Sequence, residues 1–98
     1  MTADPRRLVI DPASVPRFAP HARLHHDRAG QRWVVLAPER MFVLDEISVE
    51  VLQRLDGQRS VAALAAELAA GFDAPLSVVE ADVTALLQEL ADKLVVTA

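Results

Sequence analysis

The pattern of apolar and polar positions changes character near residue 45. Before it, short β-branched and aromatic runs are separated by turn residues, and after it apolar residues recur every three or four positions. The first pattern is typical of strands and the second of amphipathic helices. The sequence therefore predicts strands followed by helices.

The first half predicts an antiparallel meander. Its expected strands cover residues 21–28, 32–37 and 40–44. Leu24 is the clearest inward residue of the first strand, and Gly30 is available for a positive φ in the connection that follows. Pro38 presets φ for a turn with Glu39 before the third strand. A sheet this small needs a cover over its apolar face.

The second half predicts three helices with identifiable ends. Asp45 is expected to cap the first helix, which ends at Gly57 in a left-handed conformation. Ser60 caps the second helix, and Ser77 with Glu80 has the spacing of a capping box for the third. The expected buried faces are Ile47, Val51, Leu52 and Leu55; then Val61, Leu64, Ala65, Leu68 and Phe72; then Val79, Val83, Leu86, Leu87, Leu90 and Leu94. Residues 95–98 add a short extended tail.

These elements predict an α+β fold, winged-helix-like, with a three-stranded antiparallel sheet followed by three helices (β-β-β-α-α-α). Residues 16–98 form the expected single domain, and residues 1–15 form a proline-containing N-terminal arm. The arm carries apolar residues, so it packs either on its own domain or on a second copy, and exchange of arms would make a homodimer.

Composition narrows the class of protein. The 98 residues suit one domain, there is no cysteine for a disulfide or thiolate site, and no apolar run is long enough to span a membrane. We therefore expect a soluble, cytoplasmic protein. Residues 1–44 hold seven arginines against four carboxylates, and residues 45–98 hold three basic residues against ten carboxylates. The acidic half either solvates the helices or meets a basic partner.

Candidate chemistry is sparse. His25 and His26 are adjacent on a predicted strand, so their side chains point to opposite faces, and with His21 they do not predict a metal site. No nucleophile lies beside a base, and carboxylates at this density are typical of solvated helix surfaces. We expect no enzyme activity, no catalytic residue and no cofactor.

Nucleic-acid binding is the alternative from another class. A winged-helix outline suggests an acidic DNA-binding or regulatory protein, but the third helix offers carboxylates with only Lys93 at its end. A recognition helix needs cations to neutralise phosphates. The sequence therefore favours no nucleic acid as partner.

The third strand offers a binding edge. In meander order, residues 40–44 lie at the edge of the sheet, where unpaired backbone groups form a template for an added strand. Two alternatives remain open at this point: the arm covers the edge, or Pro38 and Arg40 only guard it.

The segment LAPERMFVLDEI, residues 36–47, closely resembles the signature of the PqqD family of pyrroloquinoline quinone biosynthesis proteins. Weaker matches follow at Val51-Leu52, Leu55-Asp56-Gly57, Arg59-Ser60-Val61-Ala62, Asp82-Val83, Leu86-Leu87 and Leu90, so the resemblance runs from about Pro16 to Leu94. Two features depart from the family pattern. The arm before Pro16 is extra, and Leu94 stands where family members often have a glycine.

The resemblance implies a non-catalytic peptide chaperone, a RiPP recognition element, which binds the precursor peptide PqqA and presents it to the radical SAM enzyme PqqE. It implies a peptide added as a strand beside the third strand, in a groove bordered by the third helix. The implied peptide-binding residues are Arg40, Met41, Phe42, Val43 and Leu44 for the strand, and Asp82, Val83, Leu86, Leu87 and Leu90 for the wall. One face of the strand, either Met41 and Val43 or Phe42 and Leu44, is expected to pack on the helices.

Overall fold

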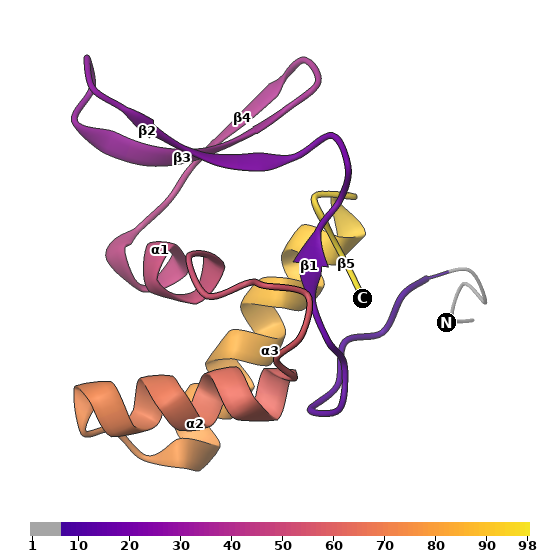
Figure 1. Ribbon diagram of the computed structural model, residues 1–98, viewed down its shortest axis with the longest axis vertical. Helices are drawn as coiled ribbons and strands as arrows, with labels where there is room; N and C mark the ends of the chain where they lie inside the picture. The colour runs from indigo at the N-terminus through magenta and orange to yellow at the C-terminus, as the bar shows by residue number, and fades with distance from the viewer. Residues whose placement is uncertain (1–6) are drawn as a thin grey trace.

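A three-stranded antiparallel sheet lies across one end of a group of three helices (Figure 1). The computed structural model describes residues 7–98. Its elements are β1 (Arg17–Phe18), β2 (Arg23–Asp27), β3 (Arg32–Ala37), β4 (Arg40–Val43), α1 (Glu46–Leu52), α2 (Val61–Phe72), α3 (Leu76–Asp92) and β5 (Val96–Thr97). The predicted α+β class and the order of the main strands and helices are confirmed, and β1 pairs with β5 in a second, two-stranded sheet.

The main sheet has the order β2-β3-β4, as a meander requires. Val35 of the central strand pairs with Leu24 on β2 and Phe42 on β4, and these three side chains face the helices. In the first hairpin the positive φ belongs to Gln31, at 52°, so its assignment to Gly30 was wrong. A Cβ at Gly30 would lie 2.8 Å from the Asp27 carboxylate, so a larger residue there would require the Asp27 side chain to shift.

The core forms where the helices pack against each other and under the sheet. It contains Val35, Val51, Leu52, Val61, Leu68, Val83, Leu87, Leu90, Val95 and Val96, together with Ile10 from the arm. The predicted buried faces are confirmed with three exceptions. Ile47, Phe72 and Leu94 are 70%, 61% and 77% exposed, so their assignment to the core was wrong.

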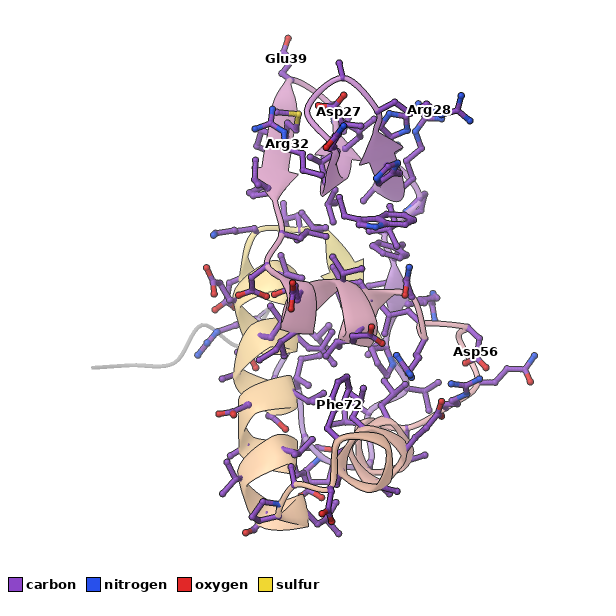
Figure 2. All side chains as sticks on the ribbon, turned by 90° about the vertical axis from the view of Figure 1, so that its left-hand side faces the viewer. Asp27, Arg28, Arg32, Glu39, Asp56 and Phe72 are labelled. Atoms are coloured by element: carbon purple, nitrogen blue, oxygen red, sulfur yellow. The ribbon has the colours of Figure 1, made fainter. Side chains whose placement is uncertain are left out.

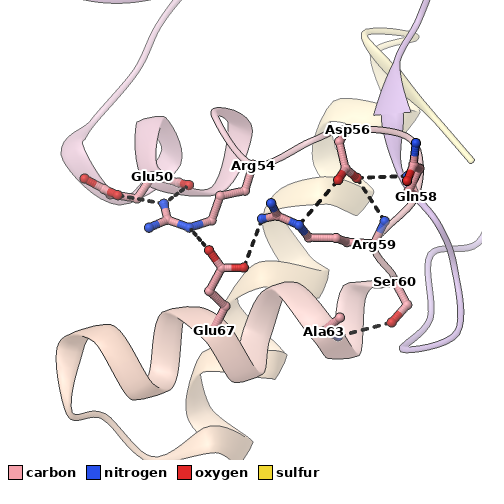
Figure 3. Close-up of polar contacts among 8 residues, drawn as sticks. All are labelled: Glu50, Arg54, Asp56, Gln58, Arg59, Ser60, Ala63 and Glu67. Atoms are coloured by element: carbon pink, nitrogen blue, oxygen red, sulfur yellow. Dashed lines mark hydrogen bonds and ion pairs between the residues drawn. The ribbon is translucent and has the colours of Figure 1, made fainter.

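Helix α1 is shorter than predicted, because it ends at Leu52 and not near Gly57. The Arg54 guanidinium donates to the Glu50 carbonyl at 2.6 Å (Figure 3). In a continuing helix this carbonyl would have accepted from the Arg54 amide. The Arg54 amide bonds the Val51 carbonyl instead, which tightens the chain into a turn. Gly57 does take a positive φ of 73°, but in the loop beyond the helix.

Helix α3 begins without a side-chain cap. Its N-cap is Pro75, and Ser77 lies inside the first turn, so the predicted capping box from Ser77 was wrong. The reason is the tight turn before it: Asp73 has φ 50°, and the Ala74 amide bonds the Ala69 carbonyl. The chain therefore reverses early enough for α3 to start before Ser77. Ser60, in contrast, accepts from the Ala63 amide at 3.1 Å and caps α2 as predicted.

The end of α3 is a Schellman turn. The Leu94 amide bonds the Ala91 carbonyl at 3.0 Å, and the Val95 amide bonds the Leu90 carbonyl at 2.9 Å. This geometry places Leu94 in the left-handed region, at φ 63°, which explains why glycine suits the position. The turn redirects the chain into β5, as the expected extended tail.

The described part of the arm packs on its own domain. The Gln88 side chain accepts from the Ile10 amide at 2.8 Å and donates to the Leu8 carbonyl at 2.9 Å. Arg7 forms two hydrogen bonds, both of 2.9 Å, with the Asp92 carboxylate. Ile10 is only 4% exposed. These contacts place residues 7–10 along one flank of α3.

Candidate functional site

Strand β4 is an edge of the main sheet. It pairs with β3 on one side, and within residues 7–98 no strand pairs with its other side. The described part of the arm does not cover this edge, since β1 pairs with β5 and residues 7–10 contact α3 through Gln88 and Asp92. In the described part of the chain, the alternative that the arm covers the edge is therefore excluded.

The hydrogen-bond phase of β4 determines which backbone groups point outward. The Leu44 amide donates to the Trp33 carbonyl at 3.1 Å, so residues 33 and 44 form a hydrogen-bonded pair. Hydrogen-bonded pairs alternate with non-hydrogen-bonded pairs along an antiparallel ladder. By the observed register, residues 42 and 40 also bond toward β3, whereas Met41 and Val43 oppose Leu36 and Val34 without bonding them. The amides and carbonyls of Met41 and Val43 therefore point away from the sheet.

The side chains of β4 divide between two faces. Phe42 and Leu44 pack against the core, whereas Met41 and Val43 are 49% and 57% exposed. Of the two alternatives left open by the sequence, the structure therefore selects Phe42 and Leu44 as the packed face. The Lys93 ammonium lies 5.4 Å from the centroid of the Phe42 ring, so the end of α3 reaches the inner side of β4.

A groove of about 270 Å³ continues from the end of β4 between α1 and α3. We call it the α1–α3 groove, and its lining includes Asp45, Ile47, Ser48, Val51, Asp82, Val83, Ala85, Leu86 and Glu89. Two of the expected wall residues, Asp82 and Leu86, lie on its side, and Val83, which is 3% exposed, forms its floor. Leu87 and Leu90 lie inside the core at 0% and 4% exposed, so they support this wall from behind.

Asp45 caps α1 where the chain passes from β4 into this helix. Its carboxylate accepts from the Ser48 amide at 2.7 Å, as predicted for an N-cap. This backbone hydrogen bond, followed by that of the Ser48 side chain, lowers the pKa of the Asp45 carboxyl below its ordinary value. Asp45 therefore stays ionised at neutral pH and gives the groove a negative side where β4 ends.

The sequence interpretation missed six residues that line the groove: Asp45, Ile47, Ser48, Val51, Ala85 and Glu89. Ile47 was assigned to the core because it lies on the apolar stripe of α1. A signal for its exposure was present, because Ile47 lies in the first turn, directly after the strand, where α1 leaves the sheet. Glu89 lies three residues after Leu86 and so shares its helix face.

The histidines lie apart from this edge. His25 and His26 are both exposed on β2, the opposite edge strand, and the His26 ring lies 5.0 Å from the ring of Trp33. Among the described residues, no three His, Asp or Glu side chains form a cluster that could hold a metal ion. No helix in that part of the chain is long and apolar enough to cross a membrane.

Comparison with known proteins agrees with the fold and with the signature. The family described as "Coenzyme PQQ synthesis protein D (PqqD)" matches residues 32–96, from β3 to β5. A "PqqA binding protein" of Rhodopseudomonas palustris strain TIE-1 is 49% identical over 89 residues, which cover 91% of this chain and 87% of that protein.

Solved structures give the same result. One is the solution structure of the PqqD truncation of Methylobacterium extorquens PqqCD, described as a functional and stand-alone RiPP recognition element. It is similar with a TM-score of 0.79 and 37% identity over 91% of this chain and 95% of that one. A lasso peptide synthetase B1 complexed with its leader peptide shares the fold, with a TM-score of 0.73 at 21% identity over 87% of this chain and 100% of that one. The chain therefore belongs to the PqqD family.

Proposed function

We propose that this chain binds the precursor peptide PqqA as an added strand along β4 and presents it to the radical SAM enzyme PqqE during pyrroloquinoline quinone biosynthesis. The observation that carries the proposal is the open edge of β4, where the backbone groups of Met41 and Val43 point outward. Family membership supports the choice of peptide, because relatives at about half identity are PqqA binding proteins.

The proposed site has two parts. The strand part consists of Arg40, Met41, Phe42, Val43 and Leu44, and the wall consists of Asp82, Val83, Leu86, Leu87 and Leu90. Backbone bonds to an added strand supply affinity that tolerates many sequences, and apolar contacts beside it supply selectivity. In this proposal Leu86 makes direct contact, whereas Leu87 and Leu90 hold it in place from the core.

The role is binding without catalysis. A peptide that is disordered when free loses entropy on binding, so tight binding requires buried apolar anchors in addition to backbone bonds. The α1–α3 groove beside the edge strand offers such a surface at Leu86 and Ile47. Presentation to PqqE then requires only that the reactive segment of the peptide extends beyond the groove.

Isothermal titration of the full chain with synthetic PqqA tests the function. We expect saturable, one-to-one binding that a peptide of the same composition in scrambled order does not reproduce. Equal binding of the scrambled peptide would overturn the proposal. A steep, salt-dependent shift with duplex DNA in place of peptide binding would favour the nucleic-acid alternative.

The domain bounds, the homodimer and the cytoplasmic location remain predictions. We propose residues 16–98 as the domain that carries the peptide site, with residues 1–15 as its arm. The homodimer through arm exchange is checked by light scattering of the purified chain, where a monomeric mass would contradict it. The cytoplasmic location is likewise a prediction.

A further inference from the structure

A second cleft adjoins the α1–α3 groove at the far end of α3. It has a volume of about 260 Å³ and lies where α1, the end of α2 and the start of α3 meet. We call it the tip cleft, and its apolar walls are Ile47, Leu68, Phe72, Val78, Val79 and Val83. Figure 2 shows Phe72 between α1 and α2, on the side of the molecule that faces the viewer.

Three large apolar side chains are exposed at this cleft. Ile47, Phe72 and Val78 come from three different helices and are 70%, 61% and 54% exposed. Single exposed apolar residues need no explanation, but a cluster that lines one depression is typical of a binding surface.

The tip cleft lies directly beside the α1–α3 groove. Ile47, Asp82 and Val83 line both. The groove itself begins at Asp45, two residues after the end of β4. A chain that runs along the edge strand and past its end therefore enters the groove first and the tip cleft next.

The charge around the cleft selects the chemistry of the occupant. The carboxylates of Glu50 and Asp82 lie at the cleft, and Phe72 is the last residue of α2, where the helix dipole is negative. Glu50 is paired with Arg54 at 2.7 Å, whereas within residues 7–98 no basic side chain forms an ion pair with Asp82. The site therefore favours a cation near Asp82 and an apolar side chain between Phe72 and Val78.

We infer that the tip cleft is a second subsite of the peptide site, which takes an apolar side chain adjacent to a lysine or arginine in the peptide segment beyond the added strand. The inference rests on the proposed function. It accounts for the exposure of Ile47 and Phe72, which helical periodicity assigned to the core. It also gives a role to Asp82, one of the carboxylates in the acidic half of the chain.

The first test compares two exposed valines. We expect Val78→Ser to weaken the binding of synthetic precursor peptide about 10-fold, as measured by isothermal titration. Val9→Ser is the matched control, because Val9 is 64% exposed on the arm and lies outside both clefts. Phe72→Ala is a second variant with the same expectation. Equal affinities of Val78→Ser, Phe72→Ala and Val9→Ser would overturn the inference.

The second test addresses charge. We expect Asp82→Asn to weaken binding and to reduce its dependence on salt concentration, whereas Glu80→Gln, on another face of α3, changes neither. An unchanged salt dependence in Asp82→Asn would contradict the predicted cation.

The outcomes separate this inference from the proposed function. Peptide binding that survives in Val78→Ser, Phe72→Ala and Asp82→Asn, but not in a variant of the β4 edge, would remove the tip cleft and keep the function. No binding by the unaltered chain would remove both. Sedimentation that shows a dimer in the unaltered chain and a monomer in Val78→Ser, with equal peptide affinity, would assign the cleft to a second copy and overturn the inference.

Discussion

The Leu44 amide donates to the Trp33 carbonyl over 3.1 Å, and this bond sets the phase of the whole edge strand. Because hydrogen-bonded and non-bonded pairs alternate, it directs the Val43 amide away from the sheet. The same phase applies to Met41. The edge strand thus offers two outward amides on a backbone held by its inner neighbour.

Replacing Val43 with proline tests this phase. The change removes an outward donor and no bond to β3, so we expect a folded protein without measurable peptide binding. Leu44→Pro is the contrasting variant, because it removes the bond to Trp33 and should lower the free energy of unfolding. Titration calorimetry and urea unfolding measure the two effects. Unchanged peptide affinity in Val43→Pro would refute the site on β4.

The Gln88 side chain binds the backbone of the arm at Leu8 and Ile10. Gln88→Ala removes the bonds to Leu8 and Ile10, so we expect the free energy of unfolding to fall by about 1–3 kcal/mol. Arg7→Ala removes an exposed ion pair, which solvent screens, so we expect a clearly smaller change in the free energy of unfolding. Urea denaturation measures both, and equal effects of the two variants would contradict this role of Gln88.

Leu94 occupies a backbone conformation that suits glycine. Its φ of 63° costs an L-residue roughly 1–2 kcal/mol, and its side chain is 77% exposed, so little burial is lost when it is removed. Glycine costs about 0.5–1 kcal/mol in chain entropy. We therefore expect Leu94→Gly to raise the free energy of unfolding by about 0.5 kcal/mol. Destabilisation in urea would contradict the Schellman geometry.

Ser60 caps α2, whereas Ser77 has only the sequence spacing of a cap and lies inside α3. Ser60 accepts from the Ala63 amide, so Ser60→Ala should cost about 1 kcal/mol of stability. Ser77 lies inside α3 without a capping bond, so Ser77→Ala should change stability by less than about 0.5 kcal/mol. A larger loss in Ser77→Ala than in Ser60→Ala, measured by thermal or urea unfolding, would contradict the observed start of α3.

The capping bond of Asp45 predicts a dependence on pH. Its pKa is lower in the folded chain than in the unfolded one, so its contribution is complete above the unfolded value of about 3.9 and is lost as pH falls through the folded value. We expect Asp45→Ala to be about 1 kcal/mol less stable at neutral pH. The difference in the free energy of unfolding between Asp45→Ala and the unaltered chain should stay constant from pH 7 to 5 and become smaller below about pH 4. A difference in the free energy of unfolding that grows below pH 4 would contradict the lowered pKa of Asp45.

The features that depend on local sequence patterns could be predicted from the sequence. Alternation gave the sheet, helical spacing gave the three amphipathic helices, and Asp45 and Ser60 gave two of the helix starts. Periodicity failed at Ile47 and Phe72, because it reports which face of a helix is apolar and not how far a neighbouring helix extends over it. Ile47 lies at the start of α1 and Phe72 at the end of α2, and both line the open tip cleft.

The contacts of the arm also depend on tertiary structure. Gln88 reads as an ordinary polar residue on a helix surface, and only the folded chain brings it to residues 8 and 10, about eighty positions away in sequence. Tertiary packing likewise ended α1 early, since Arg54 also reaches Glu67 on α2 at 3.0 Å (Figure 3). Neither arrangement has a local signature.

The most direct measurement is NMR of the labelled chain with unlabelled precursor peptide. The account predicts cross-strand contacts between the peptide and the outward side of Met41 and Val43, with slowed hydrogen exchange at those two amides alone among residues 40–44. Peptide contacts confined to the β2 edge or to the arm, with Met41 and Val43 still exchanging freely, would contradict it.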